Sequence, residues 1–240
     1  MTFNGIDVSR WQGQINWAQV KASGIQYAIL KCGGSDDGQY TDKTFVYNYD
    51  QARANGIKVG VYYFVGKNFF TFDDAVAQAK HCLRILDGRE LDLPVYVDIE
   101  APPTGNKQAL TEAALAFMAT IGSDGYRYGV YGSDISGFKD RMNYDVFLLN
   151  PEISIWCARY GSAPKYATKY DIWQSSSSGS VPGINGRVDT DVVNPEAFGD
   201  EPAPLNVAPA TTVPEGVSVV EKNMTKELAH KIYDLIKEYL

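Results

Sequence analysis

The chain has 240 residues and a mass of 26.5 kDa, which suits one domain of about 200 residues with an additional segment. Apolar residues make up 45% and charged residues 21% of the chain, a composition that supports a buried core and excludes global disorder. The formal charge is −7 and no basic stripe is present, so nucleic acid is not an expected partner. A polyanionic target would have to be held by shape and hydrogen bonds.

Rare residue types narrow the chemistry further. With only two histidines, His81 and His230, a three-histidine zinc site is excluded. The cysteines Cys32, Cys82 and Cys157 are isolated and odd in number, so we expect small buried side chains instead of a disulfide framework. No stretch approaches the roughly 18 apolar residues of a membrane span, and the first residues lack a signal-peptide pattern. We therefore expect a soluble chain with no membrane span and no export signal of its own.

Short β runs alternate with helical stretches in the first part of the chain. Strands are predicted at 3–8, 27–32, 57–65, 93–100 and 126–131, and helices at 16–23, 42–55, 71–88 and 110–121. Asn16 with Gln19 three residues later is typical of a helix start, and Thr71 with Asp74 resembles a capping box. Strands that alternate with helices indicate parallel βαβ units.

The rhythm changes after residue 131. Three short strands are predicted at 154–158, 170–174 and 187–189, with little room for full helices between them. Five strands with helices and three nearly without favour a closed, irregular α/β barrel of the TIM type over an open doubly wound sheet. No GxGxxG or Walker-type loop occurs, so no nucleotide or other cofactor is expected.

The last 40 residues differ from the rest in composition. We predict a catalytic barrel at 1–199, a Pro-rich linker at 200–221 and a C-terminal amphipathic helix at 222–240. One face of that helix carries Leu228, Ile232, Leu235, Ile236 and Tyr239. This face suits docking on the barrel, self-association with another chain, or the start of a further module.

Carboxyl groups are expected to meet at one mouth of the barrel. In the strand at 93–100, alternation turns the apolar residues toward the helices and Asp98 and Glu100 toward the axis, near the end where barrel active sites form. Asp7 in the first strand and Asp189 in the last follow the same alternation. Like charges in a partly enclosed pocket raise at least one carboxyl pKa, which provides the protonated acid that glycosidic bond cleavage needs.

Other interpretations of these acids remain open. A single Asp at a strand end is more often a turn or helix cap than a catalyst. The same carboxylates could bind a divalent metal, but nothing else in the sequence supports that, so no metal site is assigned. Aromatic residues follow several of the predicted strands and could stack on sugar rings. They are Trp11, Tyr62, Phe64, Tyr131, Trp156 and Trp173.

Several segments together resemble the glycoside hydrolase family 25 lysozymes, in order and over about residues 3–198. The segments are Gly5–Gly13, Val97–Glu100, Val130–Ser133, Ile155–Tyr160 and Ile172–Asp189. The resemblance implies a (β/α)5(β)3 barrel that hydrolyses the β-1,4 bond from N-acetylmuramic acid to N-acetylglucosamine in peptidoglycan. Two positions depart from the family. Tyr63 stands where the family often has His, and the segment 31–35 lacks an acidic residue often seen there.

The same resemblance implies roles for the four acids. Glu100 matches the general acid, Asp98 matches the carboxylate that assists the reacting centre, and Asp7 and Asp189 match the remaining acids of the cleft. It also implies retention, with the substrate's own N-acetyl group as nucleophile. We expect a phage or prophage endolysin that acts extracellularly on bacterial peptidoglycan glycan strands and leaves the host cytoplasm through a separate, holin-type pore. A bacterial autolysin and a non-catalytic peptidoglycan-binding module are the alternatives.

Overall fold

The computed structural model describes residues 4–199. The predicted linker at 200–221 and the predicted helix at 222–240 lie outside the described residues, and so does any self-association through that helix. Within residues 4–199, no helix has the length and apolar character that crossing a membrane requires.

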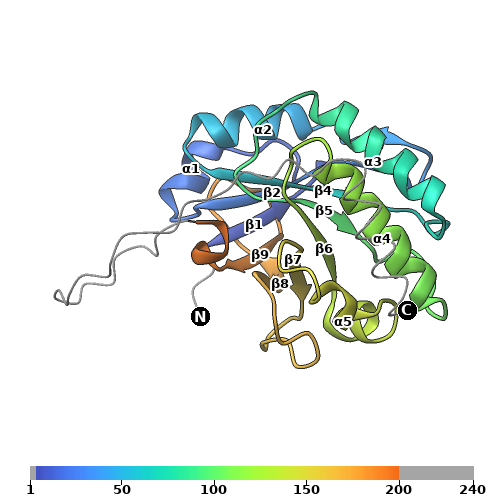
Figure 1. The fold of residues 1–240 in the computed structure, drawn as a ribbon. Helices are drawn as coiled ribbons and strands as arrows, with labels where there is room; N and C mark the ends of the chain where they lie inside the picture. Colours follow the sequence, from blue (N-terminus) through green and yellow to red (C-terminus); the bar gives the residue numbers. More distant parts are fainter. Residues whose placement is uncertain (1–3, 200–240) are drawn as a thin grey trace, which may run out of the picture.

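In the described part of the chain, eight strands close into a barrel (Figure 1), and a ninth, two-residue strand, β3, pairs with the end of β2. Neighbouring strands follow the order β1, β9, β8, β7, β6, β5, β4, β2, and the pairing of β1 with β2 closes the ring. The strands are β1 Gly5–Val8, β2 Tyr27–Gly34, β3 Tyr40–Thr41, β4 Lys58–Phe64, β5 Val95–Asp98, β6 Tyr128–Ser133, β7 Ser154–Ala158, β8 Ile172–Gly179 and β9 Val188–Val193. The predicted irregular α/β barrel is confirmed.

Among residues 4–199, the long helices belong to the first part of the chain and cover one side of the barrel, while the side of β8 and β9 carries no long helix from this range (Figure 1). The helices are α1 Trp17–Ala22, α2 Phe45–Ala54, α3 Phe72–Leu86, α4 Lys107–Gly122 and α5 Tyr144–Phe147, with short or irregular turns η1 Arg10–Gln12, η2 Asp134–Lys139 and η3 Pro195–Phe198. Helix α4 starts three residues earlier than predicted because Asn106 caps it, its Oδ1 accepting from the Ala109 amide at 3.2 Å.

The last two strands differ from the prediction in length and direction. Both β8 and β9 continue several residues beyond their predicted ends, because they pair with each other as an antiparallel hairpin. Strand β9 is also antiparallel to β1, with Asp7 paired to Asp189. Asp189 therefore lies near the start of its strand and not at its end, yet it reaches the same mouth of the barrel as the carboxyl ends of the parallel strands.

Alternation along the strands separates two apolar clusters. Val95 and Val97 face outward and join the large cluster between barrel and helices, whereas Tyr96 faces inward and joins a smaller cluster inside the barrel. The inner cluster includes Tyr27, Ile29, Tyr96, Tyr131, Trp156 and Ile172. These large side chains fill the barrel interior, so the open space lies at its mouth. The three cysteines are buried free thiols, as predicted.

Candidate active site

A cleft of about 170 Å³ opens at the mouth of the barrel. Its walls are formed by Asp7, Ser9, Trp11, Lys31, Tyr62, Phe64, Asp98, Glu100, Tyr131, Trp156, Gln174 and Asp189. The structure thus brings together the four acids that the sequence singled out and five of the six aromatic residues. Trp173 is the exception, since it does not line the cleft.

Strand register explains why the four acids meet. Asp7 on β1 is paired with Asp189 on the antiparallel β9. Asp98 is the last residue of β5, where it lies between Phe64 of β4 and Tyr131 of β6. Glu100 follows two residues after the strand ends and is the most exposed of the four.

Asp98 and Glu100 form the central acidic pair. Asp98 is 3% exposed, and its Oδ1 has no hydrogen-bond partner among the described residues. Burial first and the neighbouring Glu100 second raise the pKa of Asp98 well above its usual range, with Lys31 acting in the opposite direction. Loss of water around Glu100 also raises its pKa, and Lys31 and Arg141 oppose that shift. Both shifts favour a proton on this pair.

Gln174 holds Asp7 in place. The Gln174 Nε2 donates to Asp7 Oδ2 at 2.7 Å, and its Oε1 accepts from the hydroxyls of Tyr131 at 3.0 Å and Tyr160 at 3.2 Å. Two donors on the amide oxygen fix which end of the amide faces Asp7. Burial, together with the negative charges of Asp191 and Asp189, raises the pKa of Asp7, and the hydrogen bond from Gln174 limits that rise.

The aromatic residues form a buried floor and an exposed rim. Trp156 is 1% exposed, and its ring centroid lies 4.4 Å from that of Tyr131 and 5.9 Å from that of Tyr62. At the rim, Trp11 is 77% exposed, and the Lys31 Nζ lies 4.3 Å from the ring centre of Phe64. An exposed Trp beside a lined cleft is the arrangement that stacking on sugar rings requires.

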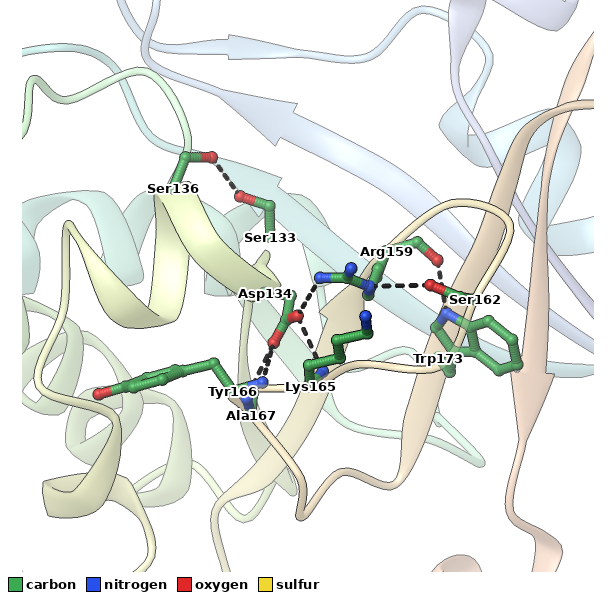
Figure 2. Close-up of polar contacts among 9 residues, drawn as sticks. All are labelled: Ser133, Asp134, Ser136, Arg159, Ser162, Lys165, Tyr166, Ala167 and Trp173. Carbon is green, nitrogen blue, oxygen red and sulfur yellow. Dashed lines mark hydrogen bonds and ion pairs between the residues drawn. The ribbon is translucent and has the colours of Figure 1, made fainter.

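Trp173 stabilises the loop that follows β7. Its Nε1 donates to the Arg159 backbone oxygen at 2.7 Å, and the side chain is buried. The same loop is held by Asp134, whose carboxylate accepts from Arg159 Nη1 at 2.7 Å and from three backbone amides at 2.9 Å, as Figure 2 shows. These amides belong to Lys165, Tyr166 and Ala167. Trp173 therefore stabilises the same loop that Asp134 holds.

Four polar residues in or near the cleft were not among the predicted site residues: Ser9, Lys31, Gln174 and Asp191. Lys31 lies on the inward face of β2, two residues after Ile29, so alternation could have placed it. Gln174 stood inside the motif used for the family resemblance but was given no role. Asp191 was missed because the predicted last strand stopped at Asp189, although the two acids share one face of β9.

Tyr63, one of the two departures from the family pattern, faces away from the cleft. Its hydroxyl donates to the Gly34 backbone oxygen at 3.1 Å and lies 3.0 Å from His81 Nδ1. Its ring packs in the outer core against Phe117 of α4. Within residues 4–199, no group of three or more His, Cys, Asp or Glu side chains is placed to hold a metal ion.

A closed β/α barrel with carboxyl and aromatic side chains gathered where its parallel strands end is an arrangement that suits glycoside hydrolysis. The sequence model of the glycosyl hydrolases family 25 matches residues 6–184, and the chain belongs to this family of glycoside hydrolases.

Named relatives agree with this assignment. The chain is 30% identical over 188 residues to the autolytic lysozyme of Clostridium acetobutylicum, covering 78% of this chain and 54% of that protein. It is 30% identical over 217 residues to lysozyme M1 of Streptomyces globisporus, covering 80% and 68%. The solved structure of the CTP1L endolysin superposes with a TM-score of 0.69 at 28% identity, covering 80% of this chain and 67% of that one. The chain thus spans about half of the first relative and two thirds of the others.

Proposed function

We propose that this protein is a lysozyme that hydrolyses the β-1,4 bond between N-acetylmuramic acid and N-acetylglucosamine in bacterial peptidoglycan. The observation that carries the proposal is the meeting of Asp7, Asp98, Glu100 and Asp189 with a rim of aromatic residues in one cleft. Family membership and the relatives named as lysozymes support it.

Glu100 is the proposed general acid. It is more exposed than Asp98, and it extends from the end of β5 into the cleft, where a glycosidic oxygen can approach it. The raised pKa of Glu100 favours its protonated form, which proton donation to the leaving oxygen requires. The two carboxyls share a proton in the proposed mechanism: when Glu100 carries it, the buried Asp98 beside it is ionised and stabilises the positive charge that develops at the anomeric carbon.

The proposed reaction proceeds in two steps with retention. In the first, the acetamido oxygen of the N-acetylmuramic acid attacks its own anomeric carbon, the glycosidic C–O bond breaks, and Glu100 transfers its proton to the leaving oxygen. In the second, the Glu100 carboxylate takes a proton from water as the water oxygen bonds to the anomeric carbon and the acetamido ring opens. Glu100 ends the cycle protonated, and one water is consumed for each bond that is cleaved.

Glu100→Gln tests the assignment, because the amide keeps the shape of the side chain but cannot give up a proton. We expect clearing of purified cell walls to fall by at least about 100-fold, the usual contribution of general acid catalysis. Glu90→Gln is the matched control, since the Glu90 side chain is 89% exposed and does not line the cleft. Full activity of a folded Glu100→Gln protein would overturn the role of Glu100.

The bond is identified by mass spectrometry of the digested cell wall after borohydride reduction. A new reducing end on N-acetylmuramic acid supports the muramidase proposal. A new reducing end on N-acetylglucosamine would indicate a glucosaminidase, and free stem peptides would indicate an amidase. Binding to cell walls without release of any product would support a binding module in place of an enzyme.

We also propose that the enzyme acts outside the cytoplasm, as an endolysin that reaches the wall through a separate pore, with a bacterial autolysin as the alternative. Its support is the likeness to proteins named as an endolysin and as an autolytic lysozyme. Expression in a bacterial cytoplasm should leave cells intact until a pore-forming protein is co-expressed. Lysis without the pore would contradict this route.

A further inference from the structure

Asp191 is a buried carboxyl that the proposed mechanism does not use. It lies on the inner face of β9, two residues after Asp189, and is 0% exposed. Its strand partner on β1 is Gly5, so it lies one inward-facing layer deeper in the barrel than the pair of Asp7 and Asp189. A Cβ atom on Gly5 would come within 3.3 Å of the Asp191 Cβ, so the glycine leaves room for the acid. Asp191 is not part of the cleft lining.

The hydrogen bonds of Asp191 are incomplete. Its Oδ1 accepts from the Trp156 Nε1 at 2.9 Å, and its Oδ2 has no partner among the described residues. A fully buried carboxylate with one side-chain donor is costly, whereas the neutral acid loses less on burial. Burial and the charge of Asp189 raise the pKa of Asp191 to about 8, although the hydrogen bond from Trp156 acts in the opposite direction.

Trp156 connects Asp191 to the cleft. The indole N–H of Trp156 donates to Asp191, on the side that faces the barrel interior. The indole ring packs against Tyr131 and Tyr62, both of which line the cleft. Tyr131 in turn donates to Gln174, the residue that orients Asp7. The hydrogen bond to Asp191 therefore helps to hold Trp156, and with it the aromatic floor of the cleft.

A charge on Asp191 would also be felt directly by its neighbours. The titratable groups that face it are Asp7 of β1, Asp189 of β9 and Tyr96 of β5, alongside the neutral Trp156 of β7 and Gln174 of β8. Negative charge on Asp191 favours the protonated forms of Asp7 and Tyr96. Ionisation of Asp191 would place a further negative charge beneath the acids of the cleft.

We propose that Asp191 is a positioning residue for the reaction of this cleft: its neutral carboxyl anchors the Trp156 indole under the acids, and its ionisation ends activity at alkaline pH. The proposal rests on the lysozyme function proposed above. Asp191 acts through Trp156 and Asp7 and does not touch the substrate.

Nuclear magnetic resonance of the indole group tests the anchoring without any activity measurement. The Trp156 Nε1–H signal, assigned with Trp156→Phe, is followed from pH 5 to pH 10 in the full chain. We expect it to shift with a midpoint near the pKa of about 8 in the wild type and to show no such transition in Asp191→Asn, which keeps the oxygen acceptor. A flat wild-type signal, or the same midpoint in Asp191→Asn, would overturn the proposal.

Activity on purified cell walls tests the link to the reaction. We expect Asp191→Ala to lose about tenfold in kcat at pH 6, equivalent to about 1.4 kcal/mol. Asp191→Asn should restore kcat to within about twofold, and its alkaline limb should move upward by about one pH unit or more. Thr190→Val is the control, because Thr190 directly precedes Asp191 on β9 and its side chain lies on the opposite face of the strand.

The outcomes separate the two proposals. A folded Asp191→Ala protein with the wild-type pH profile, or equal losses in the Ala and Asn variants at every pH, would refute the positioning role. If the indole signal titrates as expected but the wild type releases no sugar reducing ends, the lysozyme proposal fails and the anchoring of Trp156 by Asp191 stands.

Discussion

At the scale of single residues, Gln174 is the side chain that decides how Asp7 meets the cleft. Its amide oxygen accepts from two tyrosine hydroxyls, so its NH2 group lies on the side of Asp7, to which it donates. That hydrogen bond favours the ionised form of Asp7, against the effect of burial. The charge state of Asp7 therefore depends on the neutral side chain of Gln174 as well as on the neighbouring acids.

Gln174→Leu removes this donor while keeping a side chain of similar size. We expect the pKa of Asp7 to rise further, because the hydrogen bond that favours its charged form is lost. The acidic limb of the kcat/KM profile on cell walls should move to higher pH, and kcat/KM at pH 6 should fall about tenfold, the worth of one charge-assisted hydrogen bond. We expect a smaller effect from Tyr160→Phe, since the Tyr131 hydroxyl still donates to the Gln174 oxygen. An unchanged profile in Gln174→Leu would mean that Asp7 does not depend on this contact.

Alternation along a strand correctly predicts that an acid faces the barrel interior wherever the predicted strand is long enough to include that acid. Asp7 and Asp98 fall on the inner face together with residues that fill the barrel. Asp191 could not be found in this way, because the segment at 187–189 looks like a complete short strand until its pairing with β1 and β8 is known. Alternation in the sequence indicates which face of the sheet a side chain lies on. The length of a strand depends on the strands that pair with it.

At the scale of elements, the hairpin of β8 and β9 is the least predictable part of the fold. The second half of β8 is a run of serines, Ser175–Ser178, which has little β preference of its own. It becomes a strand because β9 pairs with it and then with β1. The first five predicted strands are rich in Val, Ile and Tyr, and they lie close to the observed β1, β2, β4, β5 and β6. The β preference of the residues is strong in those five strands, whereas the extent of β8 and β9 is determined by their pairing with each other and with β1.

Asp134 is the structural anchor of the loop between β7 and β8. Its buried carboxylate accepts from Arg159 and from three successive backbone amides (Figure 2). These hydrogen bonds hold the pKa of Asp134 below its usual value despite the opposing effect of burial. The Arg159 backbone in turn bonds Trp173 and Gln174, so the anchor supports the wall of the cleft.

Asp134→Asn keeps one oxygen but removes the charge and turns an N–H group toward donors. We expect the free energy of unfolding to fall by about 2–4 kcal/mol, as for a broken buried ion pair with unpaired amides. Urea unfolding followed by fluorescence measures the change. Asp140→Asn is the control, because Asp140 is exposed at the end of η2 and should change stability by less than about 0.5 kcal/mol. Equal stability of the two variants would show that the loop needs no anchor.

At the scale of the whole molecule, the closed barrel gathers acids that the folded state prefers to keep protonated. Folding raises the pKa values of Asp7, Asp98, Glu100, Asp189 and Asp191 above their ordinary values. Because these groups bind more protons when folded than when unfolded, their contribution to stability is largest at low pH. It is lost as the pH rises from about 4 through the folded-state pKa values, of which that of Asp191 is about 8.

We therefore expect the thermal midpoint to be higher at pH 5 than at pH 8, by at least about 2–4 °C, which corresponds to about one pKa unit on one group. His81 acts against this trend, since its pKa is lowered by burial and by Arg84, but it is one group against five acids. Calorimetry at constant ionic strength measures the midpoints, and Asp191→Asn should narrow the difference because one raised acid is gone. A midpoint that is flat or rises from pH 5 to pH 8 would mean that these acids are ionised at little cost. Catalysis by a protonated acid would then have no support from the fold, since the same burial that destabilises the charged carboxyls is what keeps a proton available in the cleft.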